Sequence, residues 1–512
     1  MIARALCLLL ALIAGGAAAQ ATLVGNCSGN CSLHCSTSGI PALVDAARNA
    51  DHATAVALLA ERAEPNQSEA DGTTPLHWAV HHDDADLVRR LLDAGANVAT
   101  ANDYGATPMS EAAVAANPEV LAALLDARAD VDSPNADGQT ALMVVARGGN
   151  RAAALLLIER GADVNAREQR KGQTALMWAV AQSHSPMVEL LLAHGAEVDA
   201  RSTANEWERM VTAEPRQKNL MPGGFTPLLY AARQGCLECA RQLIAAGAKV
   251  DLTDPDGVTP LLSALLNAHF DTAKYLLSVG ANVNKWDFWG RTPLYAAVDF
   301  NTLPHGGRPD RLSLDDTTNL AMIDILLEAG ANPNAQLKLF PPYRSLRMDR
   351  GADGILDIGT TPLLRAARGA DIAAIDRLVA ADALLDLPQR DGITPLMAAV
   401  GAGAGSVDTR GKFRTGLDAV AAAEALLDAG AGIDVRDARG RTALHHAAAI
   451  GYTEVVALLA ARGADLTAQD ADGVTPLDAA NGKLRGRGRN SGAAHPATAE
   501  ALQGLLTATV AR

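Results

Sequence analysis

The sequence predicts an all-α solenoid of about twelve stacked helix-turn-helix repeats with hairpin-like fingers between them. Two observations predict this fold class. Hydrophobic residues make up 49% of the 512 residues and aromatic residues only 3%, so the apolar share is mainly Ala, Leu and Val. This composition suits closely packed helices better than a β-sandwich or barrel. In addition, a Thr-Pro-Leu motif or a close variant recurs, most often every 33 residues, with its threonine at Thr74, Thr107, Thr140, Thr174, Thr226, Thr259, Thr292, Thr361, Thr394, Thr442 and Thr475.

Each copy contains the pattern of two short helices. The motif is followed by small residues, a short break and an apolar stretch ending in Leu-Leu, as in Thr442–Leu459. In most copies a Gly-Ala pair stands 21 residues after the threonine, and an Asp-x-Gly turn then predicts the finger. One helix pair cannot bury its apolar face alone, so we expect neighbouring pairs to stack around one continuous core.

The glycine of the Gly-Ala pair is expected to adopt a left-handed conformation at the end of the second helix, as at Gly95. Arg128 and Asp382 replace this glycine in repeats 3 and 9. Because a side chain is strained in that conformation, we expect these two repeats to be locally weaker by roughly 1 kcal/mol.

The residues Thr74–Ala79 read Thr-Pro-Leu-His-Trp-Ala, which matches the Thr-Pro-Leu-His-x-Ala motif of the 33-residue ankyrin repeat. The chain therefore resembles an ankyrin-repeat protein, over about residues 41–480. A degenerate first copy at Pro41–Leu43 brings the number of repeats to twelve. The resemblance implies stacked helix pairs whose first helices and fingers line a concave groove. His77 and His445 occupy the usual histidine place of the family, where a structural hydrogen bond to the neighbouring finger is implied.

The first 19 residues have the pattern of a secretory signal peptide. Arg4 supplies a positive charge, Ala5–Ala14 is a short apolar run, and Ala17–Ala19 provides a small-residue cleavage site before Gln20. Together with the Ala-, Arg- and Gly-rich composition, this predicts an exported bacterial protein, periplasmic or secreted. The alternative is an uncleaved membrane anchor. No later stretch approaches the ~20 apolar residues of a transmembrane helix, so we expect no stable membrane insertion.

The charge balance bears on the class of partner. The 44 basic and 58 acidic residues give a formal net charge of −14. Because nonspecific nucleic-acid binding needs a basic surface, we expect no nucleic-acid partner.

Four departures from the 33-residue spacing locate insertions. Two fall in fingers, and two, at about 302–318 and about 401–416, separate the helices within repeats 8 and 10. The expected organisation is a signal peptide at 1–19, a Cys-containing N-terminal segment at 20–39, repeats 1–5 at 40–201, a finger insertion at 202–223, repeats 6–8 at 224–336, a finger insertion at 337–357, repeats 9–12 at 358–482, and a basic loop with a C-terminal capping helix at 483–512. The finger insertions are either specificity loops beside the groove or neutral loop growth.

The candidate partner-binding residues are mostly aromatic, because exposed aromatic side chains dominate binding hot spots. They comprise three residues that stand four places after a repeat threonine, a cluster around the finger between repeats 7 and 8, and residues of the finger insertions. In that order they are Trp78, Trp178 and Tyr230; Trp286, Phe288, Trp289 and Tyr295; and Trp207, Tyr343 and Arg344. The alternative is that these rings pack on neighbouring fingers.

Five cysteines remain after removal of the signal peptide, and they are candidates for disulfide formation: Cys27, Cys31, Cys35, Cys236 and Cys239. The first three are spaced four residues apart, which also allows a metal site. Cys236 and Cys239 have the Cys-x-x-Cys spacing of redox and zinc sites, although a buried structural thiol is the default for Cys239. A redox or metal-binding exported protein is therefore one alternative function.

No catalytic or phosphate-binding motif is present in the sequence. We therefore expect a non-catalytic scaffold that binds a protein or peptide in the groove and needs no cofactor or metal; the sequence specifies no oligomeric state. The remaining alternative is an enzyme whose site is built by the insertions, with Asp315, Asp316, Asp349 and Asp353 as the acids to examine first.

Overall fold

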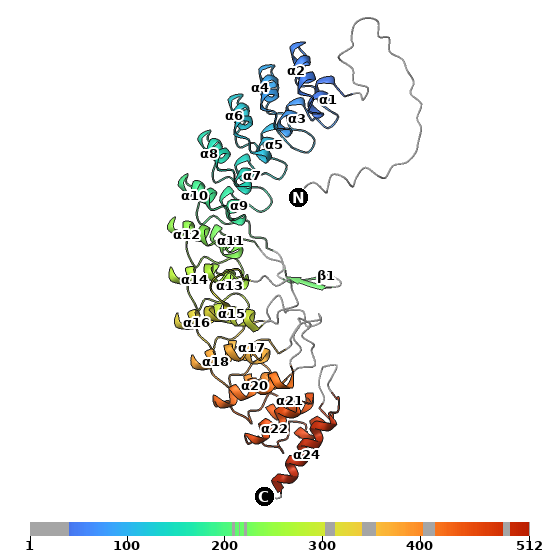
Figure 1. The fold of residues 1–512 in the computed structure, drawn as a ribbon, viewed down its shortest axis with the longest axis vertical. Helices are drawn as coiled ribbons and strands as arrows, with labels where there is room; N and C mark the ends of the chain where they lie inside the picture. The colour runs from blue at the N-terminus through green and yellow to red at the C-terminus, as the bar shows by residue number, and fades with distance from the viewer. Residues whose placement is uncertain are drawn as a thin grey trace, which may run out of the picture.

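The computed structural model forms a curved stack of paired helices, as Figure 1 shows. It describes residues 40–206, 210–213, 216–219, 223–302, 313–339, 355–402, 415–484 and 492–510. Within these ranges there are 24 helices, which form twelve successive pairs. The predicted all-α solenoid of about twelve helix-turn-helix repeats is thereby confirmed.

The first helix of each pair belongs to an inner row. This row consists of α1 (Ala42–Arg48), α3 (Pro75–His81), α5 (Pro108–Ala115), α7 (Ala141–Gly148), α9 (Ala175–Ala181), α11 (Pro227–Gln234), α13 (Pro260–Leu266), α15 (Pro293–Thr302), α17 (Pro362–Gly369), α19 (Pro395–Ala399), α21 (Ala443–Ile450) and α23 (Pro476–Ala480). The loops that form the fingers extend from this row on the concave side of the stack (Figure 1).

The second helix of each pair belongs to an outer row. It consists of α2 (His52–Ala60), α4 (Ala85–Asp93), α6 (Pro118–Asp126), α8 (Arg151–Glu159), α10 (Ser185–Ala193), α12 (Leu237–Ala245), α14 (Phe270–Ser278), α16 (Asn319–Glu328), α18 (Ile372–Ala380), α20 (Gly416–Asp428), α22 (Thr453–Ala461) and α24 (Pro496–Val510). Inner helices pack on inner helices of the next repeat, as α7 does on α9, and outer helices pack on outer ones, as α4 does on α6.

The repeat threonine explains where the inner helices begin. Thr226, Thr259 and Thr361 each take the N-cap position, and each hydroxyl accepts a hydrogen bond from the backbone N–H three residues later. Proline follows at the first helical position, where its missing N–H costs nothing. The Thr-Pro pair is therefore a local signal for a helix start, repeated along the chain.

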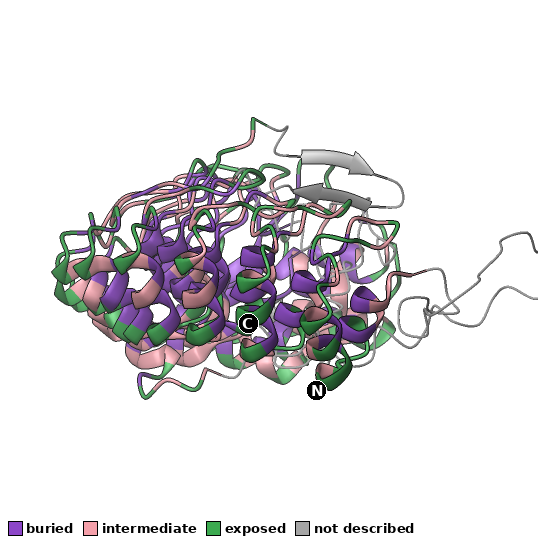
Figure 2. Cartoon of the chain, turned by 90° about the horizontal axis from the view of Figure 1, so that it is seen from above, coloured by how far each residue is buried: buried purple, intermediate pink, exposed green. Residues whose placement is uncertain are grey.

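A strip of aliphatic side chains between the two rows forms the core. The leucine of the repeat motif is buried in the inner row, as at Leu76 and Leu228, and a leucine of each outer helix meets it, as at Leu91 and Leu243. Alanines such as Ala79 are buried beside them and let the helices approach closely. Figure 2 shows the buried residues running through the interior of the stack, with exposed residues on its outside. Each repeat thus contributes a slice of one continuous core.

The first finger insertion, between repeats 5 and 6, contains a β-hairpin. Strand β1 (Met210–Ala213) pairs antiparallel with β2 (Arg216–Asn219). An isolated bridge between Ala204 and Gly223 closes the base of the insertion. The hairpin extends on the concave side of the stack (Figure 1). The sequence predicted an insertion here but not its strands.

The left-handed positions after the outer helices are occupied as expected from the sequence. Gly95 and Gly161 have φ values of 92° and 91°, and a Cβ atom added to either would meet no neighbour. Arg128 and Asp382 adopt the same region, with φ values of 65° and 59°. The left-handed backbone therefore strains Arg128 and Asp382, as expected.

We predict that Arg128→Gly stabilises the protein by about 0.5 to 1 kcal/mol, because relief of the left-handed strain exceeds the entropy that glycine adds to the unfolded chain. Asp382→Gly should gain less, since Asp tolerates this conformation better. Urea denaturation followed by circular dichroism measures both changes. Gly161→Ala is the matched control and should lose stability; equal stabilities of all three variants would contradict the strain argument.

Candidate functional site

The inner helices lie on the concave side of the stack, and two positions, four and seven residues after the repeat threonine (after Pro41 in repeat 1), are here called +4 and +7. In several places the +7 residue of one repeat contacts the +4 residue of the next. Such pairs are Arg48 with the Trp78 ring (5.9 Å to its centroid), His81 with Glu111 (3.7 Å), Arg147 with the Trp178 ring (5.3 Å), and Arg365 with Asp299 in a buried ion pair. The candidate binding residues in this row therefore also join neighbouring repeats.

Trp78 is partly buried and held from several sides. Its indole Nε1 donates a hydrogen bond to Glu69 Oε1 (3.0 Å). Its ring stacks on His82, with centroids 6.0 Å apart, and meets the edge of His81. Arg48, which lies over the ring, also pairs with Glu69 (3.7 Å). These contacts agree with the alternative considered from the sequence, in which the ring packs on a finger.

Trp178 occupies the same position in repeat 5 but lacks this hydrogen bond. Its buried Nε1 has no hydrogen-bond partner among the residues that the structure describes. The equivalent acid is Glu168, and its carboxylate accepts hydrogen bonds from three backbone N–H groups of its own finger. This finger has one extra residue: Gly172 N–H bonds to the carbonyl four residues back, whereas Gly72 N–H bonds to the carbonyl three back. In this wider turn the Glu168 carboxylate bonds to its own finger, and Trp178 has no counterpart of the hydrogen bond that Trp78 makes with Glu69.

Tyr230 is partly exposed in the next repeat. Its hydroxyl accepts a hydrogen bond from Gln173 Nε2 (2.7 Å), and its ring meets the edge of Phe225 with centroids 5.5 Å apart. Arg233 lies over the other ring of this pair, 5.7 Å from the Phe225 centroid. Trp178, Tyr230 and these neighbours thus form an aromatic and cationic surface on repeats 4 to 6.

Two of the predicted binding residues are buried, and this part of the prediction is wrong. Tyr295 is only 1% exposed, because it stands at the third place after its repeat threonine, the same buried place as His77 and His445. Trp289 is 9% exposed, lies against Phe288 and Arg291, and its carbonyl accepts the N–H groups of residues 338 and 339. Both rings stabilise the fold and offer little surface to a partner.

Trp286 and Phe288, in the same finger between repeats 7 and 8, are exposed. Their exposed fractions are 54% and 42%, and the Lys338 ammonium lies 5.8 Å from the Trp286 ring centroid. The remaining predicted residues of the finger insertions, Trp207, Tyr343 and Arg344, lie outside the described residues.

A family profile described as ankyrin repeats in three copies matches residues 43–135, 116–202, 228–337 and 416–485, which is more than half of the chain. The chain belongs to the ankyrin-repeat family. Ankyrin repeats are typically protein-interaction domains and are usually non-catalytic. A search of the curated proteins finds no match. Among the described ankyrin helices, none has both the length and the apolar content needed to cross a membrane.

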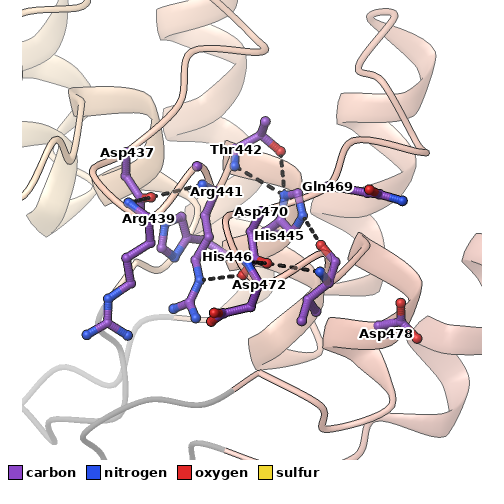
Figure 3. A network of polar contacts seen from close by, with 12 residues as sticks. Asp437, Arg439, Arg441, Thr442, His445, His446, Gln469, Asp470, Asp472 and Asp478 are labelled. Carbon is purple, nitrogen blue, oxygen red and sulfur yellow. Dashed lines mark hydrogen bonds and ion pairs between the residues drawn. The ribbon is translucent and has the colours of Figure 1, made fainter.

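Several of the ankyrin fingers share one polar turn, which Figure 3 shows for the last two fingers. The Asp437 carboxylate accepts the backbone N–H groups of Arg439 and Arg441, each through Oδ1. Its other oxygen contacts His446 Nε2 (3.1 Å), so a +4 residue is tied to its own finger, as Trp78 is. The concave row is therefore fixed to the fingers as well as to the neighbouring repeats.

The ankyrin histidines at the third place after the threonine have a structural role. His445 Nδ1 contacts the Thr442 cap and Nε2 contacts the Val474 carbonyl of the next finger (3.0 Å). His77 makes the same two contacts, with Thr74 and the Ala106 carbonyl. Burial lowers the pKa of both rings, which favours the neutral form. The hydrogen bonds that the resemblance implied are present.

The finger carboxylates differ in their proton affinity. Burial, together with the nearby Asp256 and Asp287, raises the pKa of Asp254 to about 6. At the equivalent Asp470 burial acts in the same direction, but hydrogen bonds from the Val474 and Asp472 N–H groups and from Arg441 outweigh it and hold the pKa below its ordinary value. The same turn thus carries an unstable charge in one finger and a stabilised charge in another.

The structure also places several of the cysteines and acids on which the redox, metal-binding and enzyme alternatives depend. Cys236 and Cys239 form a disulfide at the start of α12, and both are buried. The Asp315 carboxylate accepts the Asp271 N–H at the start of α14 and so caps this helix, while the Asp316 backbone N–H donates to the Asp271 carboxylate. In the described part of the chain no group of three or more His, Cys, Asp or Glu residues is arranged to hold a metal ion. The remaining candidates, Cys27, Cys31, Cys35, Asp349 and Asp353, lie outside the described residues.

We predict that Asp254→Asn stabilises the protein at pH 7 by on the order of 2 kcal/mol. The folded pKa lies above the ordinary value, so Asp254 makes stability fall as pH rises from about 4 to about 6, and the amide removes this loss. Asn can keep both turn hydrogen bonds, because Asn102 and Asn135 accept the same pair in their fingers. Chemical denaturation at pH 4, 5, 6 and 7 measures the effect.

Asp470→Asn is the control with the opposite sign. Its carboxylate pairs with Arg441 (3.2 Å), so the substitution should lower stability at pH 7 and change little at low pH, where the carboxyl is protonated. A pH profile of Asp254→Asn parallel to that of the unchanged protein would refute the assignment of the raised pKa.

Proposed function

We propose that this protein is a non-catalytic scaffold that binds a protein or peptide partner along its concave ankyrin face. The observation that carries the proposal is the row of aromatic side chains on that face. Trp178 and Tyr230 are partly exposed on adjacent inner helices, and Trp286 and Phe288 are exposed on a finger of the same side. Large aromatic surfaces with cations beside them are typical of binding hot spots.

The structural contacts divide the candidates by role. Trp178 is partly exposed and Trp286 is 54% exposed. Trp289 and Tyr295 are buried. A partner would therefore contact the first pair directly and depend on the second pair only through the fold.

We predict that Trp178→Ala and Trp286→Ala together weaken partner binding at least tenfold, because alanine removes aromatic area from the contact. The full chain is immobilised, and the proteins that bind to it are recovered and identified. The affinity of each purified candidate is then measured for the unchanged chain and for the double variant. Circular dichroism checks that the fold is retained.

Val279→Ala is the matched control, since Val279 is the C-cap residue of α14, in the outer row. It should leave affinity unchanged. Trp289→Ala should instead lower the stability of the protein, because a buried ring is removed. A partner that binds the double variant as tightly as the unchanged chain would refute a role for this face.

We also propose that the protein is exported, to the periplasm or the medium, on the strength of the charged, apolar and small-residue segments within residues 1–19. Mass spectrometry of the protein from a bacterial expression host is expected to find a chain that starts near Gln20 in the exported fraction. A chain that retains residues 1–19 in the cytoplasm would contradict export.

A further inference from the structure

The charge of the concave face changes along the stack. In repeats 4 to 6 the +4 and +7 positions hold two arginines and no acidic residue, namely Val144, Arg147, Trp178, Ala181, Tyr230 and Arg233. Outside these three repeats the same positions hold acids in repeats 1, 3 and 8, namely Asp45, Glu111 and Asp299. Repeat 9 holds Arg365, which is buried in its ion pair with Asp299, and Arg368. Repeats 4 to 6 are therefore cationic at these positions in a chain whose net charge is −14, and their arginines, unlike Arg365, are exposed.

The two arginines of this stretch are exposed and have no acidic partner. Arg147 lies over the Trp178 ring and Arg233 over the Phe225 ring. In the described part of the chain, neither guanidinium forms a salt bridge with a carboxylate. The backbone carbonyl of Arg147 also contacts His184 Nε2, which leaves its guanidinium unchanged. By contrast, Arg160 in the outer row pairs with Asp126 (2.8 Å).

This arrangement leaves both guanidinium groups available to an anion. Stacking on a ring orients a guanidinium while its N–H groups stay free for hydrogen bonds, and the planar fork matches a carboxylate. Both side chains are therefore partly ordered before a ligand arrives, which lowers the entropy lost on binding.

Trp178 lies between the two arginines along the stack and is less constrained than Trp78. The Glu69 carboxylate fixes the Trp78 ring, whereas the Trp178 N–H has no hydrogen bond within the described chain. A movement of the Trp178 ring would break no hydrogen bond and could give its N–H an acceptor from a ligand. The ring can thus adapt to a bound segment without losing an existing polar contact.

We propose, building on the proposed function, that repeats 4 to 6 bind an extended acidic segment of the partner protein. Two carboxylates of the segment pair with Arg147 and Arg233, and the residues between them lie on Trp178 and Tyr230. Packed helices are spaced by roughly 8–10 Å, so residues two repeats apart are separated by roughly 16–20 Å. An extended chain advances roughly 3.3 Å per residue, and the two acids are therefore about five or six residues apart.

The experiment selects binders to the full chain from a phage-displayed library of random twelve-residue peptides. The expected result is enrichment of peptides with Asp or Glu at two positions five or six residues apart. A fluorescein-labelled copy of the most enriched peptide, and a copy with both acids changed to amides, are then titrated with the full chain by fluorescence anisotropy. The amide copy should bind at least tenfold more weakly, and binding of the acidic copy should weaken as salt is raised.

The protein variants test the two named residues. Arg147→Gln and Arg233→Gln together should weaken binding of the acidic peptide at least tenfold. Both side chains are exposed, and circular dichroism verifies that the variant is folded. Arg160→Gln is the matched control, an exposed arginine of the outer row that should not affect binding.

The outcomes separate this inference from the proposed function. Enriched peptides without an acidic preference, or equal binding by the double variant, would overturn the inference and leave a peptide-binding scaffold. Failure to enrich any peptide would count against both. A single-stranded oligonucleotide that binds as tightly, with the same dependence on the two arginines, would show general attraction of polyanions and overturn the acidic-peptide assignment.

Discussion

Burial of an aliphatic strip between neighbouring helix pairs is the interaction on which the rest of this structure depends. No single pair can cover its own leucines, so each repeat is stable only against its neighbours, and the stack grows in one direction. The small alanines beside the leucines set how closely the inner helices approach. That approach brings the +7 residue of one repeat to the +4 residue of the next, and so produces the contacts of the concave face.

Some side chains of the concave face consequently have two roles. Arg147 and Trp178 join repeats 4 and 5 and also present charge and aromatic area to solvent. Where the pair is a buried ion pair, as between Asp299 and Arg365, little of either group is left for a ligand. The chemistry of each +7 and +4 pair therefore decides whether that part of the face serves the fold alone or is also open to a partner.

The 33-residue spacing was sufficient to predict the fold class, the number of repeats and the helix starts, because capping and burial are local and repeat in every copy. It was not sufficient to separate binding residues from core residues. Tyr295 stands one place before the +4 position, and that step of about 100° around the helix moves its ring from the groove into the core. The β-hairpin in the first finger insertion was also missed, since its two short strands follow no part of the repeat pattern.

The side-chain contacts depend on details that the motif does not contain. The spacing between Thr140 and Thr174 is 34 residues, so the sequence shows one extra residue here. Its effect on the hydrogen bond of Trp178 could not be predicted, because that required knowing which N–H groups the Glu168 carboxylate contacts. Likewise, the pKa of Asp254 is raised mainly by burial and further by acids of two successive fingers, and only the stacked geometry produces both.

The disulfide between Cys236 and Cys239 joins residues only three apart, within a single repeat. It therefore crosses no boundary between repeats and does not limit how far one repeat can rotate against the next. Between the described repeats, bending and twisting are therefore resisted by the backbone and by non-covalent contacts, so the curvature of the stack depends on how each helix pair packs on the next.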